Sequence, residues 1–319
     1  MTALARARVY MRHLAMVAVC TVACGACSPS SNDAASSALP DGFEPFVEQR
    51  WSLAAASTGY ACGTTTLAKD LWITGFRALT PSGTHHVIVS LADDTGVPTR
   101  DCARGNLDPR VLFATGSASR GFDLPSGVAL HLHAGQVLHL GIHTVNATND
   151  RLEGLSGVSV STVDASLVRH EAEVVLAGSR TFAIPARALE YVVRSEATIA
   201  EETQLFALSS VMHRLGSSQR VSVLDGHDER VLHDALFTFG EERVVAFDEV
   251  TLSAGARLAV RCTFDNVSTE LVSGGIGASN ELCLASVYRY PATGATLTRG
   301  CHDVELSCAP PRGWLGKSL

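Results

Sequence analysis

The sequence is nearly free of lysine and has no cluster of basic residues. Its 319 residues include two lysines, Lys69 and Lys317, and the formal net charge is −7 at pH 7. A nucleic-acid-binding surface needs several neighbouring Lys or Arg side chains to contact phosphates. The arginines of this chain are scattered and offer no such track, so we expect no nucleic-acid partner.

Apolar residues at helical spacing are also scarce. Short apolar runs recur instead, broken by Gly, Pro, Asp and Asn, as in DLWITGFRAL, QVLHLGIHTV and RLAVRCTF. Many short runs with regular turn signals are typical of β-sandwiches and barrels. A chain of this length exceeds what one core usually organises. The sequence therefore predicts an all-β protein with two units, at 46–180 and 181–310, and a tail at 311–319.

The first 27 residues have the pattern of an export signal. Arg6, Arg8 and Arg12 precede the short apolar run HLAMVAVCTVACGAC, which is too short to span a bilayer as a mature helix. Cys24 and Cys27 each follow small residues, as in a bacterial lipobox. Residues 28–45 are rich in Ser and Ala and are typical of a flexible tether. We expect export to the bacterial cell envelope with a lipid anchor on Cys24 or Cys27; plain cleavage and secretion is the alternative.

Six cysteines follow this segment. An even number in an exported chain predicts disulfides, and the absence of a Cys-x-x-Cys pair among them argues against a zinc ribbon. Residue types alone leave their connectivity open. The six are Cys62, Cys102, Cys262, Cys283, Cys301 and Cys308.

Twelve histidines are present, and two of them, His85 and His86, are adjacent at the start of a predicted strand. Side chains alternate across a strand, so one ring would face the core and the other the surface. If the chain bends there, both rings can contact the same ligand. Neutral imidazole is a good ligand for copper, zinc and iron, so an adjacent pair with a distant third histidine can form a metal site.

Four stretches resemble one enzyme family in sequence and in order: GTHHVIVSLAD, GQVLHLGIHTVNAT, LFALSSVMHRLGSS and RCTFDN followed by SGGIGASNELC. They resemble copper type II ascorbate-dependent monooxygenases, the peptidylglycine α-hydroxylating and dopamine β-hydroxylating enzymes and their bacterial relatives, over residues 55–305. The resemblance implies two tandem jelly-roll-like β-sandwiches, each with one copper. It places the first, electron-supplying copper on His85, His86 and His143.

The second copper of the family activates dioxygen and uses a His-x-His pair and a Met. These positions correspond here to Val211, His213 and Leu282. Two of the three side chains have no donor atom, and a single histidine is not expected to retain the metal. The family's substrate-contacting positions correspond to Ser209, Leu284 and Ser286, so its carboxylate-binding arginine is missing as well.

The same resemblance suggests disulfide partners. Cys62 and Cys301 lack their usual family partners, so other cysteines of the same unit are expected to replace them. The expected pairs are Cys262 with Cys283, Cys301 with Cys308, and Cys62 with Cys102.

The remaining histidines have simpler interpretations. His131 and His133 form a His-x-His pair that could hold a metal, but we interpret them as solvent-facing residues of an alternating strand. His139 would share a face with His143 in a regular strand. Surface positions are expected for His170, His227, His233 and His302.

Three functions fit these observations. We favour an exported copper-binding protein with one copper per chain and weak or no hydroxylase activity. The first alternative is an active monooxygenase that uses copper and ascorbate on an unknown small molecule or peptide. The second is a binding module without metal that uses the cleft between the units.

Overall fold

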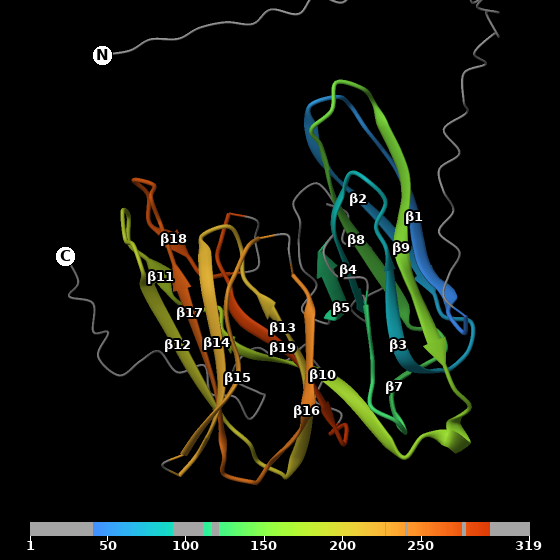
Figure 1. The fold of residues 1–319 in the computed structure, drawn as a ribbon, viewed down its shortest axis with the longest axis vertical. Coiled ribbons are helices and arrows are strands. Elements are labelled where there is room, and N and C mark those ends of the chain that lie inside the picture. The colour runs from blue at the N-terminus through green and yellow to red at the C-terminus, as the bar shows by residue number, and fades with distance from the viewer. Residues whose placement is uncertain are drawn as a thin grey trace, which may run out of the picture. The chain divides into compact units, whose positions relative to one another are not determined.

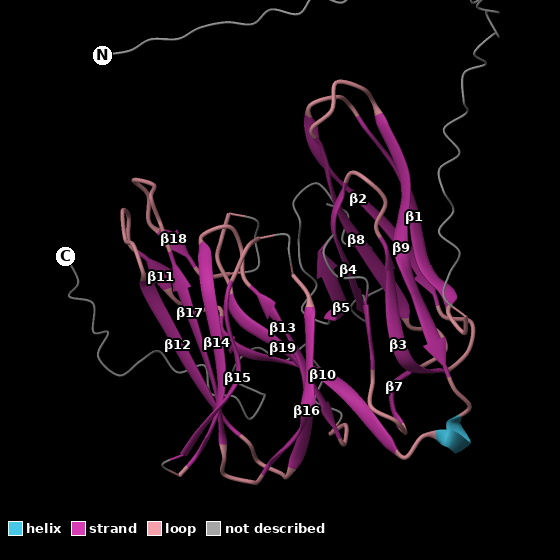
Figure 2. Cartoon of the chain, in the orientation of Figure 1, coloured by secondary structure: helices cyan, strands magenta, loops and turns pink. Residues whose placement is uncertain are grey.

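The chain is built almost entirely of β-strands (Figures 1 and 2). The computed structural model describes residues 41–91, 111–116, 121–226, 228–239, 242–275 and 279–293. Within these ranges the one helical element is the 3-10 turn η2 (Ala165–Leu167). The described ranges contain no helix with the length and apolar character that crossing a membrane requires. The predicted all-β class is confirmed.

The largest sheet has nine strands. Its order is β1 (Glu44–Leu53), β9 (Leu152–Thr162), β3 (Leu71–Leu79), β7 (Val128–Leu132), β10 (His170–Ser179), β19 (Cys283–Tyr290), β13 (Thr203–Val211) and β16 (Val244–Leu252), with β6 (Gly121–Asp123) paired to β3.

Three smaller sheets complete the described fold. One has the order β2 (Ser57–Thr66), β8 (Val137–Asn146), β4 (Thr84–Leu91) and β5 (Val111–Gly116). Another has the order β12 (Tyr191–Thr198), β17 (Arg257–Phe264), β14 (Gly216–Asp225) and β15 (Asp228–Leu236), and the last pairs β11 (Ala183–Ile184) with β18 (Val272–Ser273).

The large sheet is continuous because β10 pairs on both sides. Residues His170–Ala172 run parallel to β7, and Glu173–Ser179 run antiparallel to β19 (Figure 1). The sequence pattern did not predict this continuity, since strand pairing over such distances leaves no local signal. The predicted ends of the two units, at residues 180 and 310, stay predictions. The strand β10 pairs with strands from both halves of the chain.

Two apolar cores lie in this fold, and β10 contributes to both of them. Ala172 and Val174 pack in the first core, which is made mainly of residues 47–160. Val175 and Ala177 pack in the second, which is made mainly of residues 184–287. Because side chains alternate along a strand, one strand can supply both cores from its two faces.

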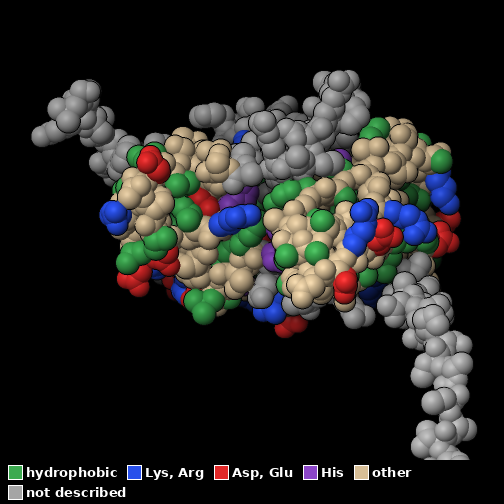
Figure 3. Space-filling model, turned by 90° about the horizontal axis from the view of Figure 1, so that it is seen from above, with side chains coloured by type: hydrophobic (Ala, Val, Ile, Leu, Met, Phe, Trp, Pro, Cys, Tyr) green, Lys and Arg blue, Asp and Glu red, His purple; other side chains and the backbone are tan. Residues whose placement is uncertain are grey.

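Burial patterns show how far each strand is covered. In β12, Arg194, Glu196 and Thr198 are exposed while the residues between them are buried, the alternation of a sheet with one solvated face. Glu196 pairs there with Arg257 at 2.6 Å, and Figure 3 shows basic and acidic side chains close together on one face. In contrast, β19 is buried at all eight positions, as expected for a central strand covered on both sides.

One disulfide ties β17 to β19. Cys262 and Cys283 are bonded, with their Cα atoms 5.6 Å apart, which agrees with the pair that the family resemblance suggested. Cys62 also takes part in a disulfide. Its expected partner Cys102 lies outside the described residues, as do Cys24, Cys27, Cys301 and Cys308.

A buried asparagine recurs at the end of a strand in both halves. The Asn146 side chain donates to the carbonyls of Ala54 and Asp150 and accepts from the backbone and hydroxyl of Thr148. Asn266 makes the same four bonds, with Pro185 and Glu270 as acceptors and Ser268 as double donor. The same hydrogen-bonded motif therefore recurs in both halves, and its pattern Asn-x-Ser/Thr-x-Asp/Glu is repeated in the sequence at residues 146–150 and 266–270.

Replacing Asn146 by Ala is expected to destabilise the protein by about 3 kcal/mol, because two backbone carbonyls and one backbone N–H lose their buried partner. Urea unfolding measures the change in the free energy of unfolding. The neighbouring exposed residue provides the control, since Asn149→Ala should change it by less than about 0.5 kcal/mol. Equal effects of the two substitutions would contradict this role of Asn146.

Candidate metal centre

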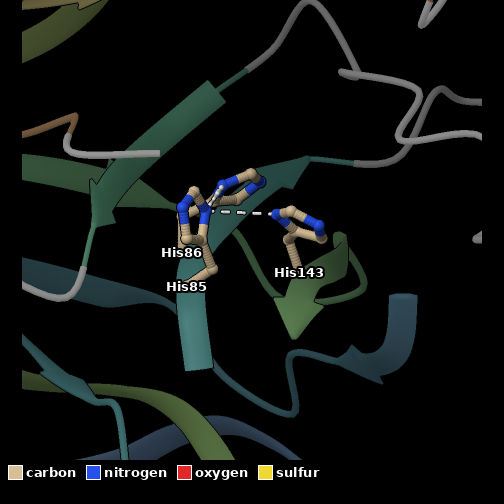
Figure 4. Close-up of side chains that lie close together, drawn as sticks. All are labelled: His85, His86 and His143. Atoms are coloured by element: carbon tan, nitrogen blue, oxygen red, sulfur yellow. Dashed lines mark hydrogen bonds between the residues drawn. The ribbon is translucent and has the colours of Figure 1, made fainter. Parts of the chain in front are cut away.

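A β-bulge at the start of β4 brings two adjacent histidines to one side. β4 pairs with β8 so that His86 lies opposite His143, and the register shifts between Thr84 and His86. His85 is the extra residue of this bulge, where the usual alternation of side chains is interrupted. Both rings of the adjacent pair therefore lie close to His143 (Figure 4).

The three imidazoles converge through their Nδ1 atoms. The His85 Nδ1 atom lies 3.5 Å from His86 Nδ1 and 3.2 Å from His143 Nδ1 (Figure 4). Each residue offers a ligand atom within 4.8 Å of the other two. Three nitrogens in a plane around a metal ion, each about 2.0 Å from it, lie about 3.5 Å apart. The geometry of this histidine triad (His85, His86 and His143) fits such an ion.

A threonine fixes which nitrogen of His143 is free. Thr58 Oγ1 donates to the backbone carbonyl of Thr144 at 3.0 Å and lies 3.0 Å from His143 Nε2. A hydroxyl has one proton, so both bonds form only if His143 Nε2 carries a proton and donates to Thr58. Nδ1 then keeps its lone pair and faces His85, as a metal ligand requires.

Burial keeps His86 and His143 neutral. His86 is 8% exposed and His143 5%, and Tyr60 stacks on the His143 ring with 4.6 Å between centroids. Desolvation, reinforced by His143, His85 and His213, lowers the pKa of His86 to about 3. Desolvation, with His85 and Arg214, lowers the pKa of His143 to about 4. At neutral pH the nitrogens are therefore unprotonated and available to a metal ion.

The second predicted group does not form a metal site. β13 ends at Val211, and His213 lies in the turn that follows, 7% exposed. Its Nδ1 donates to the carbonyl of Asn280 at 2.6 Å, which leaves the lone pair on Nε2. Leu282, the residue before β19, is buried. Since Val211 and Leu282 have no donor atom, the residues present do not fit the second copper.

A buried glutamate holds the turn of His213. The Glu281 carboxylate accepts the backbone N–H groups of His213 at 3.0 Å and of Leu215 at 2.8 Å, and it is 2% exposed. Its pKa is raised by desolvation, against the lowering effect of these bonds. The sequence does not predict this role of Glu281, because no pattern marks a carboxylate that accepts hydrogen bonds from backbone N–H groups of a distant segment.

The second half of the chain matches a known family model. Residues 170–304 match the model described as copper type II ascorbate-dependent monooxygenase, C-terminal domain. Residues 170–304 are therefore similar to the C-terminal domain of this family. The matched segment contains His213 and the Cys262–Cys283 bond, whereas the histidine triad precedes it.

Similar solved structures are distant. An infectious bursal disease virus (Gx strain) structure is 11% identical, with 81% of this chain and 75% of that chain covered and a TM-score of 0.23. The A223 turret protein of Sulfolobus turreted icosahedral virus is 6% identical, with 78% and 97% covered and a TM-score of 0.18. A vicilin from Solanum lycopersicum is 7% identical, with 79% and 75% covered and a TM-score of 0.16. TM-scores this low do not establish a shared fold.

Within the matched segment, the positions that the resemblance aligns with substrate contacts are buried. Ser209 and Ser286 face each other across β13 and β19, each 2% exposed and without a hydrogen-bond partner for its hydroxyl. Leu284 is 4% exposed. None of the three offers a charged group to a substrate carboxylate.

An aromatic ring lies near both the triad and His213. The centroid of Phe239, between β15 and β16, lies 5.9 Å from that of His86 and 6.4 Å from that of His213. Arg214 lies over the same ring, 5.6 Å from its centroid. The cavity here has a volume of about 80 Å³, well below the several hundred Å³ of typical ligand pockets. No sequence pattern predicts the place of Phe239, since a loop phenylalanine has no distinguishing signal.

The remaining histidines are dispersed. His139 is buried on β8 opposite Ser90, and His170 is exposed and stacks on Tyr290. His227 and His302 lie outside the described residues. The interpretation of His131 as solvent-facing is wrong, because its ring stacks on Trp72 with 3.8 Å between centroids.

Acid is expected to destabilise the metal-free protein through His86 and His143. Their folded pKa values lie below the ordinary value of 6.5, so below pH 6.5 the unfolded chain binds protons that the native chain does not. The free energy of unfolding should fall by about 2 kcal/mol or more between pH 6.5 and 4.5. Urea unfolding across this range measures it. His143→Gln should flatten the dependence, and an unchanged slope would contradict the assignment.

Proposed function

We propose that this chain is an exported protein that holds one copper ion through His85, His86 and His143 and has little or no hydroxylase activity. The observation that carries the proposal is the convergence of three Nδ1 atoms at 3.2 and 3.5 Å, two of them on buried rings. Neutral imidazoles suit copper, and the family is copper-dependent. Bound copper would supply one-electron redox chemistry, while the triad holds it and Tyr60 and Phe239 shield it.

The proposed lack of hydroxylase activity rests on the missing metal-ligand atoms of the second copper site. Val211 and Leu282 stand where the resemblance places a histidine and a methionine, and the turn of His213 is tied to Glu281 instead. Without a second copper, storage or handover of copper agrees better with the side chains than oxygen activation does. Similarity to the family supports the alternative of an active monooxygenase, for which ascorbate would be the reductant and a small molecule or peptide the substrate. The alternative of a metal-free binding module does not explain why the three histidines converge.

Export and anchoring are part of the proposal. The apolar run before residue 27, the cysteines Cys24 and Cys27 and the Ser/Ala-rich residues 28–45 favour a lipid-anchored protein of the bacterial cell envelope. A disulfide between Cys262 and Cys283 suits an oxidising compartment. Mass spectrometry of the protein purified from membranes would show the acylated cysteine as its first residue.

Copper content is expected to be about one ion per chain after loading with Cu(I) under reducing conditions and removal of excess metal. Elemental analysis measures it. His86→Ala combined with His143→Ala should abolish binding, because one imidazole cannot replace three. His213→Ala is the matched control, a buried histidine of the other sandwich, and should keep the copper. Two ions in wild type, or equal content in wild type and the double variant, would contradict the proposal.

Hydroxylation is expected to be absent. Copper-loaded protein with ascorbate and a panel of peptide and small-molecule candidates should show no oxygen uptake coupled to product. The control is Val211→His combined with Leu282→Met, which returns two donors and should raise the copper content to about two. Sustained formation of a hydroxylated product by the wild-type chain would show that the second site is functional.

A further inference from the structure

A second group of potential ligands lies where β7 ends and β3 begins. β3 and β7 are antiparallel, with Trp72 opposite His131, so Asp70, just before β3, comes close to His131 and His133. Asp70 Oδ2 lies 3.4 Å from His131 Nε2 and 3.8 Å from His133 Nδ1. One ligand atom from each residue lies within 4.8 Å of the other two.

These separations suit a metal ion. In a tetrahedral site with bonds of about 2.0–2.1 Å, neighbouring donor atoms lie about 3.4 Å apart. The carboxylate oxygen is close to this distance from both imidazoles. A direct hydrogen bond explains the first contact but not the second, because 3.8 Å is too long for one.

Each of the three side chains is held in place by other groups. The backbone N–H of Ala134 donates to Asp70 Oδ1 at 2.8 Å, which turns Oδ2 toward the histidines. The His131 ring stacks on Trp72 with 7° between planes. The backbone N–H of His133 donates to Gln136 Oε1 at 2.8 Å, which fixes the turn after β7.

A second carboxylate lies behind His131. Glu171 Oε1, on the neighbouring strand β10, is 4.0 Å from His131 Nδ1. A metal-bound histidine commonly directs its other nitrogen at a carboxylate, which orients the ring and raises its basicity. With neutral histidines the group carries two negative charges, which favours a divalent cation.

We propose that Asp70, His131 and His133 form a zinc-type site that is separate from the histidine triad. Two imidazoles and one carboxylate are a ligand set of Zn²⁺ sites, with a fourth position left to water. A hard carboxylate oxygen selects a divalent ion rather than Cu(I), so the site is not expected to compete for the copper of the triad. His133 and Asp70 are 59% and 56% exposed, and the bound ion is therefore open to exchange with solvent.

The test uses the full chain with His86→Ala and His143→Ala, which removes the triad. Isothermal titration with Zn²⁺ and visible absorption with Co²⁺ are measured in this background, alone and with one further substitution. His133→Ala or Asp70→Asn should weaken Zn²⁺ binding by at least about 100-fold and remove the Co²⁺ spectrum of the site. Glu171→Gln should weaken it by about 10-fold.

His233→Ala serves as the matched control in the other sandwich and should leave Zn²⁺ affinity unchanged. Since His133 is exposed, its removal should also leave the thermal unfolding midpoint of the metal-free chain unchanged, which separates loss of binding from loss of folding. The proposal is overturned if the triad-free chain binds no Zn²⁺ more tightly than about 1 mM. Equal affinity of the background, the Asp70→Asn variant and the His133→Ala variant would overturn it as well.

Discussion

The metal centre depends on one extra residue in β4. A regular strand would place His85 and His86 on opposite faces, and only one of them could reach His143. The bulge between Thr84 and His86 removes that constraint. Bulges interrupt the hydrogen-bond ladder and are tolerated where neighbouring strands hold the partner in register. Here β8 provides that support, because it pairs with β2 along its whole length and with β4 from Leu138 to Thr144.

The surroundings of the bulge fix the chemistry of the rings. Thr58 and Tyr60, both on β2, set the tautomer and the plane of His143, and Asn146 closes the end of β8 three residues later. Burial then keeps His86 and His143 neutral. A preorganised site of imidazole nitrogens suits a soft or borderline metal ion better than a hard one. The same burial makes the apo form sensitive to acid.

The two halves of the chain share one motif but differ in the side chains near their histidines. Asn146 and Asn266 make the same set of bonds in each half, so the scaffold is kept in both. In the second half, however, apolar Val211 and Leu282 stand where the family resemblance predicts ligands, and the ring of Phe239 lies near both His213 and His86. Under the proposed function, the scaffold of the family would persist without its reaction.

Sequence patterns predicted the parts that depend on local signals. The short apolar runs predicted the all-β class, and the stretches around His85 and His143 pointed to a three-histidine group through their resemblance to a family. The bulge at His85 could be expected only as one of two possibilities, because register is set by strands far away in the chain. Other features join segments that are distant in the sequence, and no residue-type pattern marks them. They are the continuous sheet through β10, the hydrogen bonds of Glu281, the position of Phe239 and the approach of Asp70 to His131.

The central claim is that the bulge places three imidazoles on one copper ion and that His213 holds none. Anomalous X-ray scattering at the copper edge, from crystals loaded with one equivalent of Cu(I), tests it most directly. The account predicts one strong peak among the Nδ1 atoms of His85, His86 and His143. A main peak at His213, or no peak at the triad, would contradict it.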